Sequence, residues 1–292
     1  MKKNAKAHGM DGTLVEPDWP PLTLGEVSEL LHQYPAVSEP ILIEFASPRP
    51  FSAAAVVKTA KGEVFVKRHH RLVRDCEGLL EEHRFIAHLR ANRVVIPRVI
   101  ENGRNETSTG TGDWTYEVHE ILPDVDLYRE AVSWSPFRSM AHAHSAGRIL
   151  ANLHRASESY AAPPRKVRPL VSSFTIFAAT NTQDAMNRYL AARPALHGRE
   201  FYEAGAEALD LLAPFEAELK PSRGQLRPLW THNDLHPSNL LWSGTGEAAR
   251  ATAIIDFGLA DRTNAVHDLA LAIERSIVEW LVLTRVRQAS MR

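Results

Sequence analysis

The sequence predicts an α+β fold of two lobes, in which a small lobe with an antiparallel sheet and one long helix precedes a larger, mainly helical lobe. Strand-like apolar runs cluster in residues 1–122, whereas Ala-, Leu- and Glu-rich helical patterns dominate residues 128–292. A length of 292 residues is also sufficient for two lobes that share a cleft. We therefore expect residues 123–127 to form the hinge between the lobes.

The first lobe is expected to begin with a tail and a short helix. Residues 1–22 are assigned to a tail or loop, because their second half is rich in Pro, Asp and Gly. Thr23 followed by Glu26 matches a capping box, in which two side chains satisfy free backbone donors at a helix start. A helix should therefore begin after Thr23 and end near Pro35.

Three strand-like runs and a long helix follow. Residues 41–46, 54–59 and 63–67 are apolar or alternate with charges, and the turn at 60–62 predicts a hairpin between the second and third runs. Across residues 75–91 apolar side chains recur at helical spacing, which predicts the long helix of this lobe.

The second lobe should be built mostly from helices. Ser135 before a proline predicts a helix start, and residues 180–220 are rich in helix formers. A second β-rich pair is expected at residues 239–242 and 252–255, joined by a polar turn that contains glycine. The last helix should begin near Asp268, which we expect to cap that helix and to anchor the neighbouring loop.

Composition excludes several classes of protein. The formal net charge of −1 provides no strong field to attract nucleic acid or an anionic membrane, so neither is an expected partner. Cys76 is the only cysteine, which excludes an intramolecular disulfide. No apolar run approaches the length of a membrane span, and no secretory signal is recognisable, so we expect a cytoplasmic protein. Its oligomeric state is not predicted.

The segment with the most chemical information is residues 232–239, with the sequence HNDLHPSN, followed by Asp256-Phe257-Gly258. Pairing of the flanking strands should bring Asn239 and Asp256 to one edge of the sheet, beside Asp234. An amide and a carboxylate form a hard-oxygen site suited to Mg²⁺. A further carboxylate that the metal does not need, Asp234, can accept a proton from an attacking hydroxyl.

This arrangement matches the catalytic template of protein kinases, and its particular form resembles the aminoglycoside and choline phosphotransferase family. The resemblance rests on the HNDLHPSN segment, on Asp256-Phe257-Gly258 and on Asp268-Leu269-Ala270, and it extends over about residues 40–280. It implies a bilobal protein-kinase-like fold and transfer of the γ-phosphate of Mg-ATP to a hydroxyl of a small molecule. An aminoglycoside-, choline- or homoserine-like acceptor is implied, and the sequence does not distinguish among them.

The resemblance also implies a role for individual residues. Asp234 would be the catalytic base, while Asn239 and Asp256 would bind Mg²⁺. Lys67, at the end of a strand, would contact the α- and β-phosphates of ATP and would pair with Glu82 of the following helix. In the strand that leads into the hinge, backbone groups of Glu120, Ile121 and Leu122 would meet adenine.

Two other functions remain open from the sequence. The expected phosphate loop, residues 46–53, contains no glycine and has two prolines, which offer few backbone donors to phosphate. A nucleotide-binding regulator without transferase activity is therefore one alternative. The other is a metal-dependent hydrolase, whose metal would be bound within the set His232, Asp234, His236, Asp256 and His267.

Overall fold

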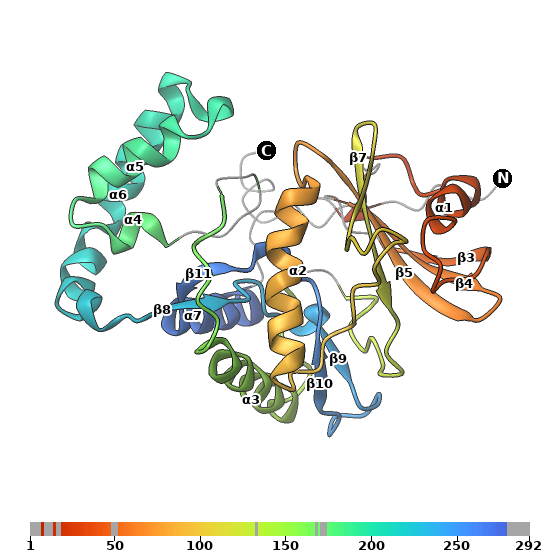
Figure 1. Cartoon of the computed structure of the whole chain (residues 1–292). Coiled ribbons are helices and arrows are strands. Elements are labelled where there is room, and N and C mark those ends of the chain that lie inside the picture. Colours follow the sequence, from red (N-terminus) through yellow and green to blue (C-terminus); the bar gives the residue numbers. More distant parts are fainter. Residues whose placement is uncertain are drawn as a thin grey trace.

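The computed structural model confirms the α+β fold, with an antiparallel sheet in the first lobe and a larger, mainly helical second lobe (Figure 1). The structure describes residues 7–8, 14–15, 19–47, 52–131, 134–166, 169 and 174–278. Residues 48–51 of the expected phosphate loop lie outside these ranges.

The first lobe is built around a five-stranded antiparallel sheet with the strand order β3-β4-β5-β7-β6. Its strands are β3 (Pro40–Ala46), β4 (Ala53–Thr59), β5 (Gly62–His70), β6 (Thr109–Thr111) and β7 (Trp114–Glu120). The predicted hairpin is confirmed as β4 and β5. Gly62 lies in its tight turn with φ of 133°, a backbone conformation that favours glycine.

The two faces of this sheet have different chemistry. On one face, Val64 and Val66 pack with the short helix α1 (Leu24–Leu31), which begins with the predicted capping box of Thr23 and Glu26. Because side chains alternate along a strand, Lys67 of β5 faces the opposite side. That side is the one that contributes to the cleft between the lobes.

Helix α2 (Cys76–Ala91) lies between the sheet and the second lobe (Figure 1). The Asp75 side chain caps its first turn by accepting a hydrogen bond from the backbone of Gly78 at 2.7 Å. Its apolar residues Phe85, Ile86 and Leu89 join the core of the second lobe. The helix therefore connects the sheet physically to the lobe that carries the predicted catalytic loop.

The second lobe contains helices, short strands and short 3₁₀ helices. Its helices are α3 (Met140–Ser157), α4 (Thr175–Ala178), α5 (Thr182–Ala191), α6 (Arg199–Leu219) and α7 (Ala265–Ile277). Its strands are β8 (Pro228–Thr231), β9 (Leu240–Trp242), β10 (Ala251–Ile254) and β11 (Asp261–Asn264). Its 3₁₀ helices are η1 (Pro194–Leu196), η2 (Lys220–Gln225), η3 (Pro237–Asn239) and η4 (Phe257–Leu259).

Two further short strands lie in the N-terminal segment, before the first lobe's sheet: β1 (Ala7–His8) and β2 (Leu14–Val15).

Two predicted helix starts were wrong. Helix α3 begins after Ser139, not Ser135, and the Ser139 hydroxyl accepts a hydrogen bond from the backbone of His142 at 3.2 Å. Helix α7 begins after Asn264, which caps it, so Asp268 lies inside the helix. The predicted pair of strands is confirmed as β9 and β10, and β8 pairs with β11 beside it.

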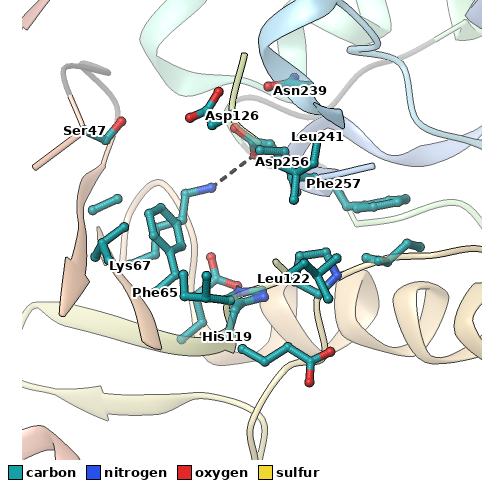
Figure 2. Close-up of a pocket in the computed structure, with 18 of the residues that line it drawn as sticks. Ser47, Phe65, Lys67, His119, Leu122, Asp126, Asn239, Leu241, Asp256 and Phe257 are labelled. Atoms are coloured by element: carbon teal, nitrogen blue, oxygen red, sulfur yellow. Dashed lines mark hydrogen bonds and ion pairs between the residues drawn. The ribbon is translucent and has the colours of Figure 1, made fainter. Parts of the chain in front are cut away.

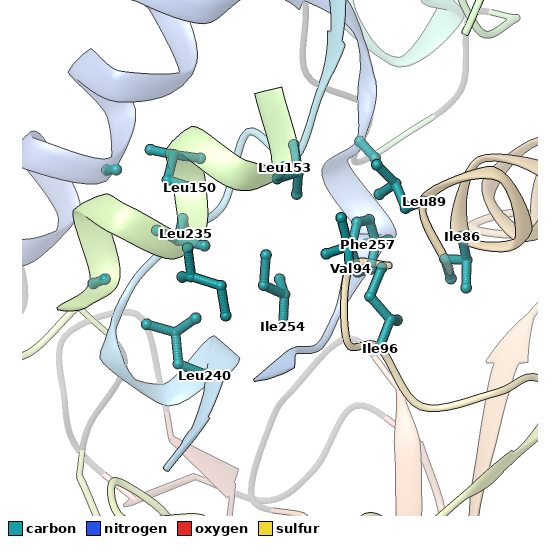
Figure 3. Close-up of a cluster of buried hydrophobic side chains, with 14 of the residues drawn as sticks. Ile86, Leu89, Val94, Ile96, Leu150, Leu153, Leu235, Leu240, Ile254 and Phe257 are labelled. Carbon is teal, nitrogen blue, oxygen red and sulfur yellow. The ribbon is translucent and has the colours of Figure 1, made fainter. Parts of the chain in front are cut away.

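The core of the second lobe lies directly beneath the loop of residues 232–239. Figure 3 shows Leu150 and Leu153 of α3 close to Leu235 of that loop, with Ile254 of β10 beside them. These side chains are buried, and burial of one such aliphatic side chain contributes about 1.5–3 kcal/mol. The loop therefore rests on a packed and rigid base.

In the described part of the chain, no helix combines the length and the apolar character needed to cross a membrane.

Candidate active site

A cavity of about 250 Å³ lies between the lobes (Figure 2). Its walls come from β3, β4, β5 and β7, from helix α2, from the segment after β7, and from the region of β9 and β10. All residues predicted to contact nucleotide or metal line it: Lys67, Glu82, Glu120, Ile121, Leu122, Asn239 and Asp256. Their convergence from distant parts of the sequence makes this cavity the candidate active site.

Lys67 and Asp256 face each other across the cavity (Figure 2), with 3.1 Å between the Lys67 Nζ and the Asp256 Oδ1. Desolvation in the cleft favours the neutral form of each group. For Asp256 the charges of Lys67 and Arg74 outweigh that effect and hold the pKa well below its ordinary value. For Lys67 the charges of Asp256 and Glu117 also prevail over desolvation and raise its pKa. Both groups are therefore ionised at neutral pH.

Asp256 occupies an unusual backbone conformation at the end of β10. Its φ of 60° and ψ of 72° place it in the left-handed region, which non-glycine residues rarely adopt. The turn carries the carboxylate to the cavity, where 40% of the Asp256 side chain remains exposed. Arg74 approaches the following Gly258 so closely that a β-carbon there would collide with the guanidinium. A larger residue at position 258 would therefore have to displace the Arg74 side chain.

The predicted ion pair between Lys67 and Glu82 is not formed. Glu82 is buried and instead lies 3.7 Å from Arg74 and 3.9 Å from Arg165. Arg165 donates hydrogen bonds to the carbonyls of Gly258 and Ala260, at 3.2 and 3.1 Å. Glu82 is thus placed to hold α2 against the segment that follows Asp256, and Lys67 turns to Asp256.

Asp234 and Asn239 are held together at the two ends of their loop. The Asn239 amide nitrogen donates to the Asp234 backbone carbonyl at 2.8 Å and to its carboxylate Oδ2 at 3.3 Å. Because these contacts use the nitrogen of the Asn239 amide, its oxygen is left as an acceptor. That oxygen and the Asp256 carboxylate form an all-oxygen donor set, which fits Mg²⁺.

His232 supports this loop as a neutral, fully buried side chain. Its Nε2 donates to the carbonyl of Ile255 at 3.0 Å, and its Nδ1 accepts from the backbone N–H of Asp234 at 3.2 Å. Burial lowers the pKa of His232, in agreement with the neutral ring that these two contacts require. Both ring nitrogens of His232 contact backbone groups and not side chains that could share a metal ion with it, which argues against the hydrolase interpretation.

Asp268 of α7 anchors the start of the loop. It is 0% exposed, and its carboxylate accepts hydrogen bonds from the backbone N–H groups of His232 and Asn233 at 3.2 and 2.7 Å. It also accepts one from the ring of His154 at 2.8 Å. The sequence predicted an anchor here correctly, but the anchoring acts through the loop backbone and not through a helix cap.

Asp234 also forms an ion pair with Arg275, in the last turn of α7. Only 17% of each side chain is exposed. Desolvation lowers the pKa of Arg275 to about 10, so the guanidinium remains charged at neutral pH. Arg275 was not predictable from the sequence, because its distance along the chain from Asp234 carries no recognisable pattern.

A second polar group lies on the cleft face of the sheet, behind Lys67. The buried carboxylate of Glu117 contacts three imidazoles, those of His69, His83 and His119, at 2.8–2.9 Å. Glu117 and His119 also line the cavity, although the sequence analysis singled out neither residue. The two are separated by one residue on β7 and therefore share a face of the strand, a spacing that could have drawn attention to them.

Comparison with known proteins places these features in a family. The sequence profile of the phosphotransferase enzyme family matches residues 44–289. No curated protein sequence matches the chain.

Solved structures share its fold at low sequence identity. The GDP and kanamycin complex of APH(2")-IIia is 15% identical, with a TM-score of 0.55 over 91% of this chain and 83% of that one. A microcompartment-associated aminopropanol kinase is 17% identical, with a TM-score of 0.54 over 86% of this chain and 74% of that one. An amicoumacin kinase in complex with AMP-PNP, Ca²⁺ and Ami is 12% identical, with a TM-score of 0.52 over 91% and 76%.

Proposed function

This chain belongs to the phosphotransferase enzyme family, and we propose that it transfers the γ-phosphate of ATP to a hydroxyl of a small molecule. The observation that supports this most strongly is the convergence of Lys67, Asn239 and Asp256 on one cavity, with Asp234 hydrogen-bonded to Asn239. Each of these groups has a distinct task in phosphoryl transfer, and all are present.

We assign the nucleotide to the cavity between the lobes. Adenine would lie against the backbone of residues 120–122, and Lys67 would bind the phosphates after exchanging its contact with Asp256 for them. Among similar structures, one contains AMP-PNP and another GDP. The glycine-free loop weakens the case for backbone binding of phosphate, so Lys67 would supply a larger share of the charge there.

Asn239 and Asp256 would hold Mg²⁺, which when bound neutralises charge on the phosphate oxygens. The low pKa of Asp256 keeps its carboxylate available to a cation over the whole physiological pH range. The Asn239 amide nitrogen donates its hydrogen bonds to Asp234, and this orientation leaves the amide oxygen to bind the cation.

Asp234 would act as the catalytic base. It accepts the proton of the acceptor hydroxyl while that oxygen forms its bond to the γ-phosphorus and the bond from phosphorus to the bridging oxygen of ADP breaks. Arg275 now occupies the Asp234 carboxylate, so an acceptor must displace this guanidinium before its hydroxyl can reach the base. We place the acceptor on the Arg275 side of Asp234 for this reason.

The acceptor is a small molecule with a free hydroxyl, in the range of aminoglycosides, amino alcohols such as choline, and homoserine. One structure of similar fold is a complex with kanamycin, and another is an aminopropanol kinase. For this chain, compounds of these two kinds are candidate acceptors. Arg275 places a positive charge beside Asp234, and the carboxylate of Glu274 lies 3.8 Å from that guanidinium.

The test is a panel of hydroxyl compounds assayed by ADP release, with Asp234→Asn as the key variant. The wild type should release ADP with at least one acceptor, and Asp234→Asn should lose most of that rate while it still binds ATP, because only the base is altered. Asp184→Asn, an exposed change on α5, is the matched control and should behave like the wild type. Near-wild-type turnover by Asp234→Asn would contradict the assignment of the base.

A further inference from the structure

The group behind Lys67 has the composition of a transition-metal site. Within the described chain, His83, Glu117 and His119 are the one set of His, Cys, Asp and Glu residues whose ligand atoms lie within 4.8 Å of one another. Both His83 Nε2 and His119 Nε2 approach the same atom, Glu117 Oε2, at 2.8 and 2.9 Å. Three donors on one small volume are the minimum that a bound zinc ion requires from protein.

We propose that His83, Glu117 and His119 bind one Zn²⁺ ion between helix α2 and strand β7. Zinc takes nitrogen and oxygen ligands at about 2.0–2.2 Å, so tetrahedral neighbours lie roughly 3.3–3.5 Å apart. The two distances to Glu117 Oε2 would lengthen by about 0.5 Å, which rotation of the side chains can supply. Two imidazoles in the set favour zinc over Mg²⁺, which prefers oxygen throughout.

The surroundings orient these ligands as metal sites require. His69 lies 2.9 Å from the other oxygen of Glu117, Oε1, and thereby leaves Oε2 for the ion. His83 Nδ1 lies 2.9 Å from the Thr107 hydroxyl, which can accept the proton that this nitrogen carries once Nε2 binds metal.

The fourth ligand position and the entry path are supplied by the cavity. His83 and Glu117 are almost fully buried, but 15% of the His119 side chain is exposed and it lines the cavity wall (Figure 2). A water molecule from that side can complete four ligands. Because Lys67 lies directly opposite Glu117 in the β5–β7 ladder, the ion would fix α2 to the sheet next to the phosphate-binding lysine.

This site is distinct from the proposed Mg²⁺ site in ligands and place. The imidazole site uses residues of the first lobe alone, whereas Asn239 and Asp256 belong to the second lobe. A variant that removes the Mg²⁺ ligand, Asp256→Asn, should therefore retain zinc. The inference does not depend on the proposed transferase activity, because its readout is metal content.

The experiment uses the full chain, stripped with a chelator and then dialysed against Zn²⁺ in excess Mg²⁺, with bound zinc measured by elemental analysis. We expect His119→Gln to retain one zinc ion fewer per chain than the wild type. His88→Gln is the matched control. His88 lies on α2 like the proposed ligand His83, but it contacts the carbonyl of Ala156 instead of Glu117. It should retain as much zinc as the wild type.

Replacement of zinc by Co²⁺ in the wild type gives a second readout that no variant can confound. A four-coordinate site with two imidazoles should show strong visible absorption, whereas a six-coordinate surface site absorbs weakly. Equal zinc retention by wild type and His119→Gln would overturn the proposal, as would a weak Co²⁺ spectrum of the wild type. A weak Co²⁺ spectrum would mean that the three imidazoles only donate hydrogen bonds to Glu117. Because this spectrum is measured on the wild type, it tests the zinc site even if His119→Gln does not fold.

Discussion

Replacement of Asp268 tests whether one buried carboxylate holds the catalytic loop in place. In Asp268→Ala the backbone N–H groups of His232 and Asn233 and the ring of His154 all lose their acceptor, in a site with no access to water. A hydrogen bond to a charged group is worth about 1.5–3 kcal/mol, and such losses within one network are not additive. Allowing for that, we expect the free energy of unfolding to fall by about 3–5 kcal/mol.

Asp268→Asn should lower the free energy of unfolding less, by about 1–3 kcal/mol. Its amide oxygen can still accept a hydrogen bond, whereas its amide nitrogen would face another N–H donor. Urea denaturation measures both, and Asp210→Ala on the exposed face of α6 is the matched control, with an expected change within about 0.5 kcal/mol. If Asp268→Ala unfolds at the same urea concentration as Asp210→Ala, the loop is held by its apolar base alone, and the anchoring argument is wrong.

Four further outcomes are expected. Asp256→Ala should abolish the Mg²⁺-dependent part of the thermal shift with ATP, which for the wild type at a hundred times Kd amounts to about 2.7 kcal/mol; an unchanged shift would rule out its role as metal ligand. Arg275→Gln should raise the rate of ATP hydrolysis by water, measured as ADP release without an acceptor, because the Asp234 carboxylate loses its ion pair. No increase in that rate would show that the ion pair does not restrain the base. Glu82→Gln should lower stability through its two buried arginine partners but leave the ATP shift largely intact; a lost shift would restore the predicted contact with Lys67. Finally, the free energy of unfolding should decrease as pH falls below about 6.5, because burial lowers the pKa of His232 in the folded state and the unfolded chain then binds more protons. Denaturation midpoints measured across that pH range should therefore depend less on pH in His232→Gln than in the wild type.

Features set by neighbouring residues were predictable from the sequence. The capping box of Thr23 and Glu26 and the hairpin turn at Gly62 depend on backbone donors and angles within a few residues, and the structure has both. The segment HNDLHPSN was equally informative, because Asn239 must lie five residues from Asp234 to bond its carbonyl. The roles proposed for these residues in catalysis stay predictions.

Features set by tertiary contacts were not predictable. The helix start moved from Ser135 to Ser139 because the Ser139 hydroxyl also donates to the distant carbonyl of Glu247 at 2.9 Å, and local cap preference is the same for both serines. The ion pair of Asp234 with Arg275 depends on how α7 returns to the loop, which no short motif encodes. The division at residues 123–127 also stays a prediction, although β7 ends just before it at Glu120.

The partners of Glu82 and Lys67 show why the missed contacts matter for function. A resemblance to kinases led us to expect that Glu82 of α2 compensates the charge of Lys67. In the structure a strand residue, Glu117, lies opposite Lys67 in the ladder and contributes more to its raised pKa than Glu82 does. Neighbours in a ladder are fixed by backbone hydrogen bonds, whereas a helix can shift relative to a sheet. Lys67 can therefore remain charged whatever the position of α2, and Glu82 is free to tie that helix, through Arg165, to the segment after Asp256.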